Sequence, residues 1–133
     1  MNPYASAKQA YTESSVLTAS PEQLVVMLYD GAIRFLNQAS AALRAGNRQQ
    51  FAVRLRRGEA IITQLNMTLD LERGGEVAER LRSIYMFSRR HLIDAQLKSD
   101  PALVDEVVGL LSELRESWAQ LAQNPGAQAA AAA

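Results

Sequence analysis

The chain has 133 residues, which is enough for one domain with a single hydrophobic core. Lys plus Arg and Asp plus Glu both number 14, so the formal net charge is zero and gives no global attraction to nucleic acid. The absence of cysteine excludes disulfides and thiolate metal sites, and it fits a reducing cytoplasm.

Residues 1–20 are predicted to be a mobile N-terminal cap segment that contains a short helix at 2–10. Its larger apolar side chains are separated by polar residues, and they are Tyr4, Tyr11, Val16 and Leu17. The segment lacks the apolar core of a secretory signal, and no apolar run of the chain is long enough to cross a membrane. We therefore expect a cytoplasmic protein without membrane insertion.

The first long helix is predicted from Pro21 to about Ala45, with Gly46 just beyond its end. Ser20 suits the N-cap position, Pro21 the first helical position, and Gln23 completes a capping box. Six bulky residues follow one another at positions 24–29, whereas an amphipathic helix needs an apolar residue only every three or four positions. The surplus must face a second packing partner within the fold or another protein.

The second helix is predicted over about 48–69, after an N-cap at Asn47. Gly58 occupies one step of its apolar stripe, where a small residue lets another helix approach closely. A turn at 72–75 separates it from a third helix over about 76–98. The apolar positions of that third helix are Val77, Leu81, Ile84, Tyr85, Leu92 and Ala95.

The fourth helix is predicted to begin at Asp100-Pro101 and to end near residue 123. A disordered, Ala-rich tail is expected over 124–133, because it offers nothing to bury. Connections this short join antiparallel neighbours. The sequence therefore predicts an all-α protein, an antiparallel up-down-up-down four-helix bundle over 21–123.

Catalysis is not predicted. The only histidine is His91, and the residue three positions before it is Ser88, so the Glu-x-x-His pairs of a di-iron bundle cannot form. Gly74-Gly75 precedes a helix without a Walker lysine, so we interpret it as a turn. We expect no catalytic residue, no metal site and no cofactor, and we interpret His91 as a boundary residue of the third helix.

Arginines gather around the first turn and the second helix, and they are Arg44, Arg48, Arg54, Arg56 and Arg57. Such a cluster could contact phosphates, but no aromatic residues alternate with it to stack bases. The fourth helix is acidic through Asp105, Glu106, Glu113 and Glu116. We expect these two helices to lie side by side with balanced charges, and we predict no nucleic-acid partner.

A binding module is favoured by the apolar surplus. In the first helix the core stripe is assigned to Leu24, Leu28, Gly31, Phe35 and Ala39. The adjoining face is then Val25, Tyr29, Ile33 and Leu36, and other helices add Leu103, Val108, Leu110, Met86 and Phe87. Any one such residue is more often core than contact, but together they predict grooves that accept an amphipathic helix.

Several short elements occur in an order that resembles the FliS family of flagellin-specific export chaperones. They are Tyr11, Val16, Thr18-Ala19-Ser20-Pro21, Leu24, Met27-Leu28-Tyr29-Asp30-Gly31-Ala32, Leu69-Asp70, Gly74-Gly75, Leu81, Tyr85 and Trp118. The resemblance extends over about 4–121, and the order and spacing of the elements make it specific.

The resemblance implies a chaperone that binds the disordered C-terminal segment of flagellin. Binding would prevent premature polymerisation and keep flagellin competent for flagellar type III export; the export apparatus or regulators of flagellin synthesis are further possible partners. The expected groove residues are Val16, Leu17, Val25, Tyr29, Ile33, Leu36, Leu103 and Val108. Members of the family use their N-terminal segment to cover the empty groove, which here would place Tyr4 or Tyr11 against it.

Two other functions stay open on the sequence. The first is a regulatory or structural bundle that self-associates through the same apolar face and has no client. The second is a small secreted helical effector, which Trp118 and the Ala-rich tail favour only weakly.

Overall fold

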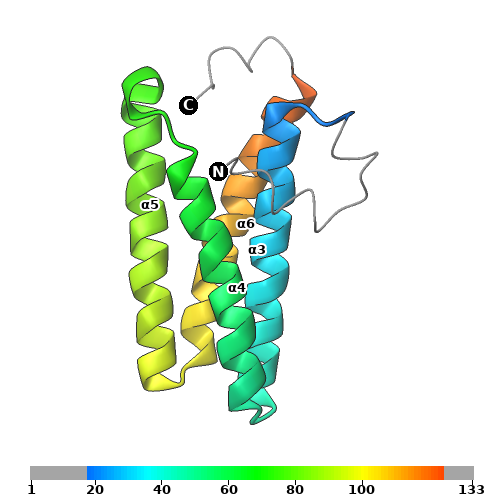
Figure 1. The fold of residues 1–133 in the computed structure, drawn as a ribbon, viewed down its shortest axis with the longest axis vertical. Helices are drawn as coiled ribbons and strands as arrows, with labels where there is room; N and C mark the ends of the chain where they lie inside the picture. The colour runs from blue at the N-terminus through cyan, green and yellow to red at the C-terminus, as the bar shows by residue number, and fades with distance from the viewer. Residues whose placement is uncertain (1–17, 125–133) are drawn as a thin grey trace.

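The computed structural model describes residues 18–124, and these residues form an antiparallel bundle of four helices without strands (Figure 1). The helices are α3 (Pro21–Arg44), α4 (Arg48–Met67), α5 (Leu71–Lys98) and α6 (Pro101–Gln123). They pack in a ring in which α3 and α5 each contact both α4 and α6. The predicted all-α four-helix bundle is confirmed, and the N-terminal cap segment before Thr18 lies outside the described residues.

Local signals set the helix starts. The Ser20 hydroxyl accepts a hydrogen bond from the backbone N–H of Gln23 at 3.2 Å, and the Gln23 side chain accepts one from the Ser20 N–H at 2.7 Å. This reciprocal pair is the predicted capping box. The carboxylate of Asp100 likewise accepts a hydrogen bond from the Ala102 N–H at 3.0 Å, so α6 also begins where the sequence predicts.

The connection between α4 and α5 differs in detail from the predicted turn at 72–75. Helix α5 begins already at Leu71, because Asp70 accepts hydrogen bonds from the N–H groups of Glu72 and Arg73 at 3.1 and 3.0 Å. The chain then bends at Gly75, whose φ of 53° and ψ of −129° are not helical. A positive φ is readily available to glycine, so the predicted turn is reduced to a kink at this one residue.

The core is apolar and continuous through the bundle. Its fully buried large side chains are Tyr29, Tyr85, Leu36, Leu55, Ile62, Leu65, Leu92, Leu111, Val104 and Val107. Gly58 lies where α4 approaches α3 closely, since a Cβ added there would stand 2.6 Å from Cδ2 of Leu36. The prediction that Gly58 allows a close helix approach is confirmed.

The four helices are not packed equally. Helix α3 contacts α4 and α6 extensively, whereas α5 contacts its two neighbours much less. The large apolar side chains that are exposed are Met67, Leu71, Val77, Phe87, Ile93 and Leu97, and all but the first belong to α5. The apolar surplus on the described surface is therefore concentrated on α5.

Candidate functional site

The division of α3 into a core stripe and an outer face is corrected by the structure. Val25, Tyr29 and Leu36 were predicted to lie off the core, but their exposed fractions are 8%, 0% and 0%. Leu24 and Phe35, which were assigned to the core, are only half-buried. The reason is the ring arrangement: α3 packs against both α4 and α6, so its buried face is wider than one stripe.

Tyr29 takes part in a buried polar contact that the sequence did not reveal. Its hydroxyl lies 2.5 Å from the hydroxyl of Tyr85 on the diagonal helix α5, with the ring centroids 6.4 Å apart. Burial raises the pKa of Tyr29 to about 12, although the neighbouring Tyr85 and Trp118 side chains act to lower it. Burial also raises the pKa of Tyr85. The pair joins the two diagonal helices through the centre of the bundle.

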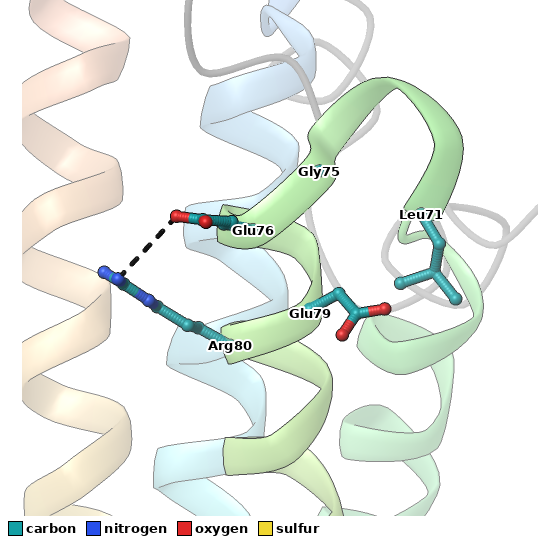
Figure 2. A pocket seen from close by; sticks show the side chains of 5 residues that line it. All are labelled: Leu71, Gly75, Glu76, Glu79 and Arg80. Carbon is teal, nitrogen blue, oxygen red and sulfur yellow. Dashed lines mark ion pairs between the residues drawn. The ribbon is translucent and has the colours of Figure 1, made fainter.

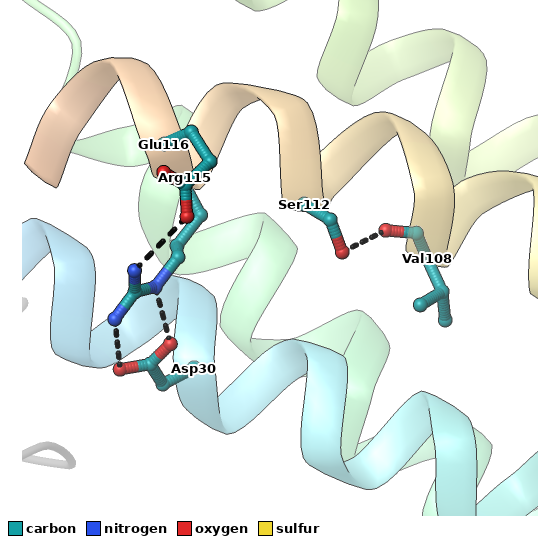
Figure 3. A network of polar contacts seen from close by, with 5 residues as sticks. All are labelled: Asp30, Val108, Ser112, Arg115 and Glu116. Carbon is teal, nitrogen blue, oxygen red and sulfur yellow. Dashed lines mark hydrogen bonds and ion pairs between the residues drawn. The ribbon is translucent and has the colours of Figure 1, made fainter.

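Two ion pairs fasten α3 to α6. Figure 3 shows Arg115 of α6 directed at Asp30 of α3, with Nε 2.8 Å from Oδ1. Toward the other end of α3, Arg44 lies 2.7 Å from Asp105, which also accepts a hydrogen bond from Ser40 at 2.7 Å. The hydrogen bond from Arg44 lowers the pKa of Asp105.

Ile33 and Val108 lie along the same α3–α6 interface, between these two ion pairs. Ile33 follows Asp30 by three positions on α3, and Val108 follows Asp105 by three on α6, so each shares a helix face with an ion-pair residue. Both are half-buried at the edge of the core. At the α3 start, the interface opens into a groove of about 550 Å³ lined by Thr18, Ala19, Gln23, Val26, Met27, Asp30, Arg115, Ala119, Ala122 and Gln123.

Leu103 lies on a different flank of α6, the one that faces α5. It shares that flank with Glu106, three positions later, which pairs with His91 of α5. The stripe continues through Leu110 and Leu114, both half-buried. Leu103 and Val108 were predicted to share a groove, but the structure places them on two sides of α6.

The facing stripe of α5 contains exposed apolar side chains. Val77 is 55% exposed and Phe87 is 45% exposed, with half-buried Ile84 between them and His91 one turn further on. The ring of Phe87 stacks on that of His91 at a centroid distance of 5.0 Å. Val77 was predicted only to be one of the apolar positions of this helix, and it is exposed because α5 packs loosely against its neighbours.

The surface between α5 and α6 defined by these two stripes is named the α5–α6 seam. Its residues are Val77, Ile84, Phe87, Leu103, Leu110 and Leu114. A hollow beyond its end, at the Gly75 kink, is lined by Glu76 and Arg80, which pair across 4.0 Å, and by Leu71 and Glu79 (Figure 2).

The described residues offer no arrangement typical of catalysis. His91 lies at the boundary between α5 and α6 and pairs with Glu106, as a boundary residue does. No group of three or more metal-ligating side chains occurs within residues 18–124. None of the four helices described is long and apolar enough to span a membrane.

Val16, Leu17, Tyr4 and Tyr11, the other predicted contact residues, lie outside the described residues. A contact role for Ile33, Leu103 and Val108 stays a prediction. Val77 and Ile84 were noted as apolar positions of the third helix but not as contact residues, and Phe87 was noted only as surplus.

Comparison with known proteins places these features in a family. The profile described as "Flagellar protein FliS" matches residues 4–125, nearly the whole chain. The chain belongs to the FliS family. Members with curated names include the "Flagellar secretion chaperone FliS" of Salmonella typhimurium, which is 38% identical over 120 residues that cover 85% of this chain and 84% of that protein.

Further relatives carry the same name. The Bacillus subtilis protein is 32% identical, with 92% of this chain and 88% of its own length covered. The Escherichia coli protein is 34% identical, with 91% and 93% covered. The FliS family is thus a family of flagellar secretion chaperones, and this chain is a member over almost its full length.

Proposed function

We propose that this chain is a cytoplasmic export chaperone that binds the C-terminal segment of flagellin. In that role it prevents premature polymerisation and keeps flagellin competent for flagellar type III export. The observation that carries the proposal is the apolar α5–α6 seam, in which Val77 and Phe87 are about half exposed. The chain belongs to a family of secretion chaperones, for which such a surface is a candidate binding site. An exposed apolar surface of this kind marks a site of protein interaction.

The client segment would supply an apolar face that covers the exposed side chains of the seam. An amphipathic helix of the client laid along the seam would cover Phe87 and Val77 on one side and Leu110 and Leu114 on the other. The client is ordered only on binding, so part of the interaction energy is used to fix its conformation. This mechanism works by occupancy and needs neither a nucleotide nor a catalytic residue.

A second part of the client is proposed to cross to the other flank of α6. There the groove at the α3 start exposes Val26 and Met27 beside the small residues Ala119 and Ala122. Ile33 and Val108 continue this side along the α3–α6 interface. The client would then wrap around α6, which accounts for predicted contact residues on both of its flanks. Val25, Tyr29 and Leu36 support this surface from within the core.

The segment before Ser20 is proposed to cover the groove when no client is bound. Thr18, where the described chain begins, itself lines the groove. The residues that precede it are therefore tethered next to it, and Tyr11 or Tyr4 is the aromatic side chain proposed to dock there. A covered groove lowers the apparent client affinity by the fraction of molecules that are covered.

Calorimetry with a synthetic peptide of the host flagellin C-terminal segment tests the proposal. We expect one peptide per chain and a gain of helical circular dichroism over the sum of the parts. Phe87→Asp should weaken binding at least about tenfold without a loss of fold, because the side chain is exposed and a charge disfavours an apolar contact. The matched control is Ala60→Asp on α4, also exposed, which should bind as the unmodified chain does.

Self-association through the exposed face of α5 is the competing function. It is favoured by the same exposed apolar side chains, which could meet a second copy of the chain. Sedimentation equilibrium decides between them. A dimer that added flagellin peptide does not dissociate, together with no heat of peptide binding, would establish self-association in place of the chaperone role.

A further inference from the structure

A second stripe of α5 combines arginines with apolar side chains. Arg82, Met86, Arg89 and Ile93 recur at steps of four, three and four, so they lie on one face of the helix. The two arginines are exposed, Met86 is half-buried and Ile93 is 52% exposed. This stripe is named the Arg–apolar stripe, and it lies on a flank of α5 other than the one that forms the α5–α6 seam.

The stripe adjoins α4. Arg89 acts electrostatically on Glu59 of α4, and so does Arg56, which stands almost one turn before Glu59. Burial raises the pKa of Glu59, while these two positive charges oppose that change. Arg56 and Arg89 therefore act on one half-buried carboxylate where α4 and α5 lie side by side (Figure 1), and Arg82 precedes Arg89 by seven positions on the same face of α5.

Carboxylates lie near these arginines without pairing closely with them: Glu59 acts on Arg56 and Arg89, and Glu79 lines a hollow together with Arg82. Arg56, Arg82 and Arg89 form no ion pair among residues 18–124. The acidic helix α6 was expected to lie beside α4 and balance its charge. That expectation is wrong, because the ring places α6 diagonally opposite α4, and Asp105 pairs with Arg44 of α3 instead.

We propose that the Arg–apolar stripe, with Arg56 of α4, is a docking surface for an acidic amphipathic helix of a second protein partner, separate from the client. Such a helix would place apolar side chains on Met86 and Ile93 and direct Asp or Glu toward the arginines on either side. Charge-assisted hydrogen bonds from guanidinium to carboxylate would fix its register. The apolar residues set between the arginines favour a protein helix over a nucleic acid, since no aromatic side chain belongs to the stripe for stacking bases.

Two designed, fluorescein-labelled peptides test the surface. Both carry Leu at helical spacing, and the flanking positions hold Glu in one peptide and Lys in the other. We expect the Glu peptide to bind at least about tenfold more tightly, with affinity that falls as salt is added. The Arg82→Glu/Arg89→Glu chain should lose binding of the Glu peptide and gain binding of the Lys peptide.

The matched control is Arg34→Glu, which makes a charge reversal on α3, diagonally opposite α5. It should bind the Glu peptide within about twofold of the unmodified chain, and thermal melts should show all variants folded. Equal binding of both peptides, or an equal loss in the control, would overturn the proposal. Displacement of the Glu peptide by the flagellin segment would also overturn it, because the stripe would then be part of the client site. Binding of a single-stranded oligonucleotide that is tighter than binding of the Glu peptide would overturn it as well.

Discussion

Removing either hydroxyl of the buried tyrosine pair tests how the diagonal helices α3 and α5 are joined. Tyr29→Phe and Tyr85→Phe each keep the aromatic ring and delete only an oxygen. The two hydroxyls lie 2.5 Å apart and both residues are essentially unexposed, at 0% and 1%. Each substitution therefore removes one partner of a hydrogen bond that water cannot replace.

The two substitutions are expected to differ in cost. Tyr29→Phe leaves the Tyr85 hydroxyl without its partner, and it also removes the hydroxyl on which the Trp118 side chain acts. A buried group left unpaired costs about 1–3 kcal/mol, so we expect a loss near ~2–3 kcal/mol of unfolding free energy. Tyr85→Phe leaves Tyr29 in contact with Trp118, and we expect a loss of only ~0.5–1.5 kcal/mol, the value of one ordinary hydrogen bond.

Urea denaturation of the two single variants and the double variant measures these costs. Because the double variant has no orphaned hydroxyl, its loss should be smaller than the sum of the two single losses by about 1 kcal/mol or more. Additive losses, or a greater loss for Tyr85→Phe than for Tyr29→Phe, would refute the assignment of Tyr29 as the shared centre of the contact.

Three other changes have outcomes that follow from the structure. Gly58→Ala should destabilise the bundle by about 1 kcal/mol net, since crowding of Leu36 outweighs the gain in helix propensity. Gly109 has open space around it, so Gly109→Ala should stabilise the bundle by up to about 1 kcal/mol in the same thermal melt. The contribution of Tyr29 to the unfolding free energy should be constant well below pH 10 and should be lost as pH rises from about 10 toward 12. Folded Tyr29, with its pKa raised to about 12, keeps a proton that the unfolded chain releases at its ordinary value of 10.0. A flat profile up to pH 12 in urea titrations would contradict that burial effect. Phe87→Asp should leave the melting temperature within a few degrees of the unmodified chain, because the side chain is 45% exposed. A cooperative loss of fold would show that the α5–α6 seam is structural.

Features set by neighbouring residues could be predicted from the sequence. The capping box of Ser20 and Gln23 involves atoms three positions apart, so it can be identified without knowledge of the fold. Asp100-Pro101 starts α6 for the same reason. Gly58 could be predicted to contact another helix because it interrupts an apolar stripe, although its partner Leu36 could not.

Features set by the ring of helices could not be predicted in this way. Val25, Tyr29 and Leu36 belong to a continuous apolar run, and which part of it is buried depends on the two neighbours of α3. Val77 has the spacing of a core residue but is exposed, because α5 bends at Gly75 and packs loosely.

Charge complementarity between helices likewise depends on which helices are adjacent. The arginines of α4 and the carboxylates of α6 suggested a match, but the two helices lie on a diagonal of the ring. The pairs that form instead, Arg44 with Asp105 and Arg115 with Asp30, both join α3 to α6. Long-range ion pairs therefore require the topology before they can be assigned.

The most direct test of the chaperone role is the effect of the purified chain on flagellin polymerisation. Monomeric flagellin from the host would be seeded with short filament fragments, and elongation followed by light scattering as the chain is added. We expect elongation to decrease linearly and to stop at one chain per flagellin, with the Phe87→Asp variant much less effective. Elongation that continues unchanged at several-fold excess of the chain would contradict the proposed function.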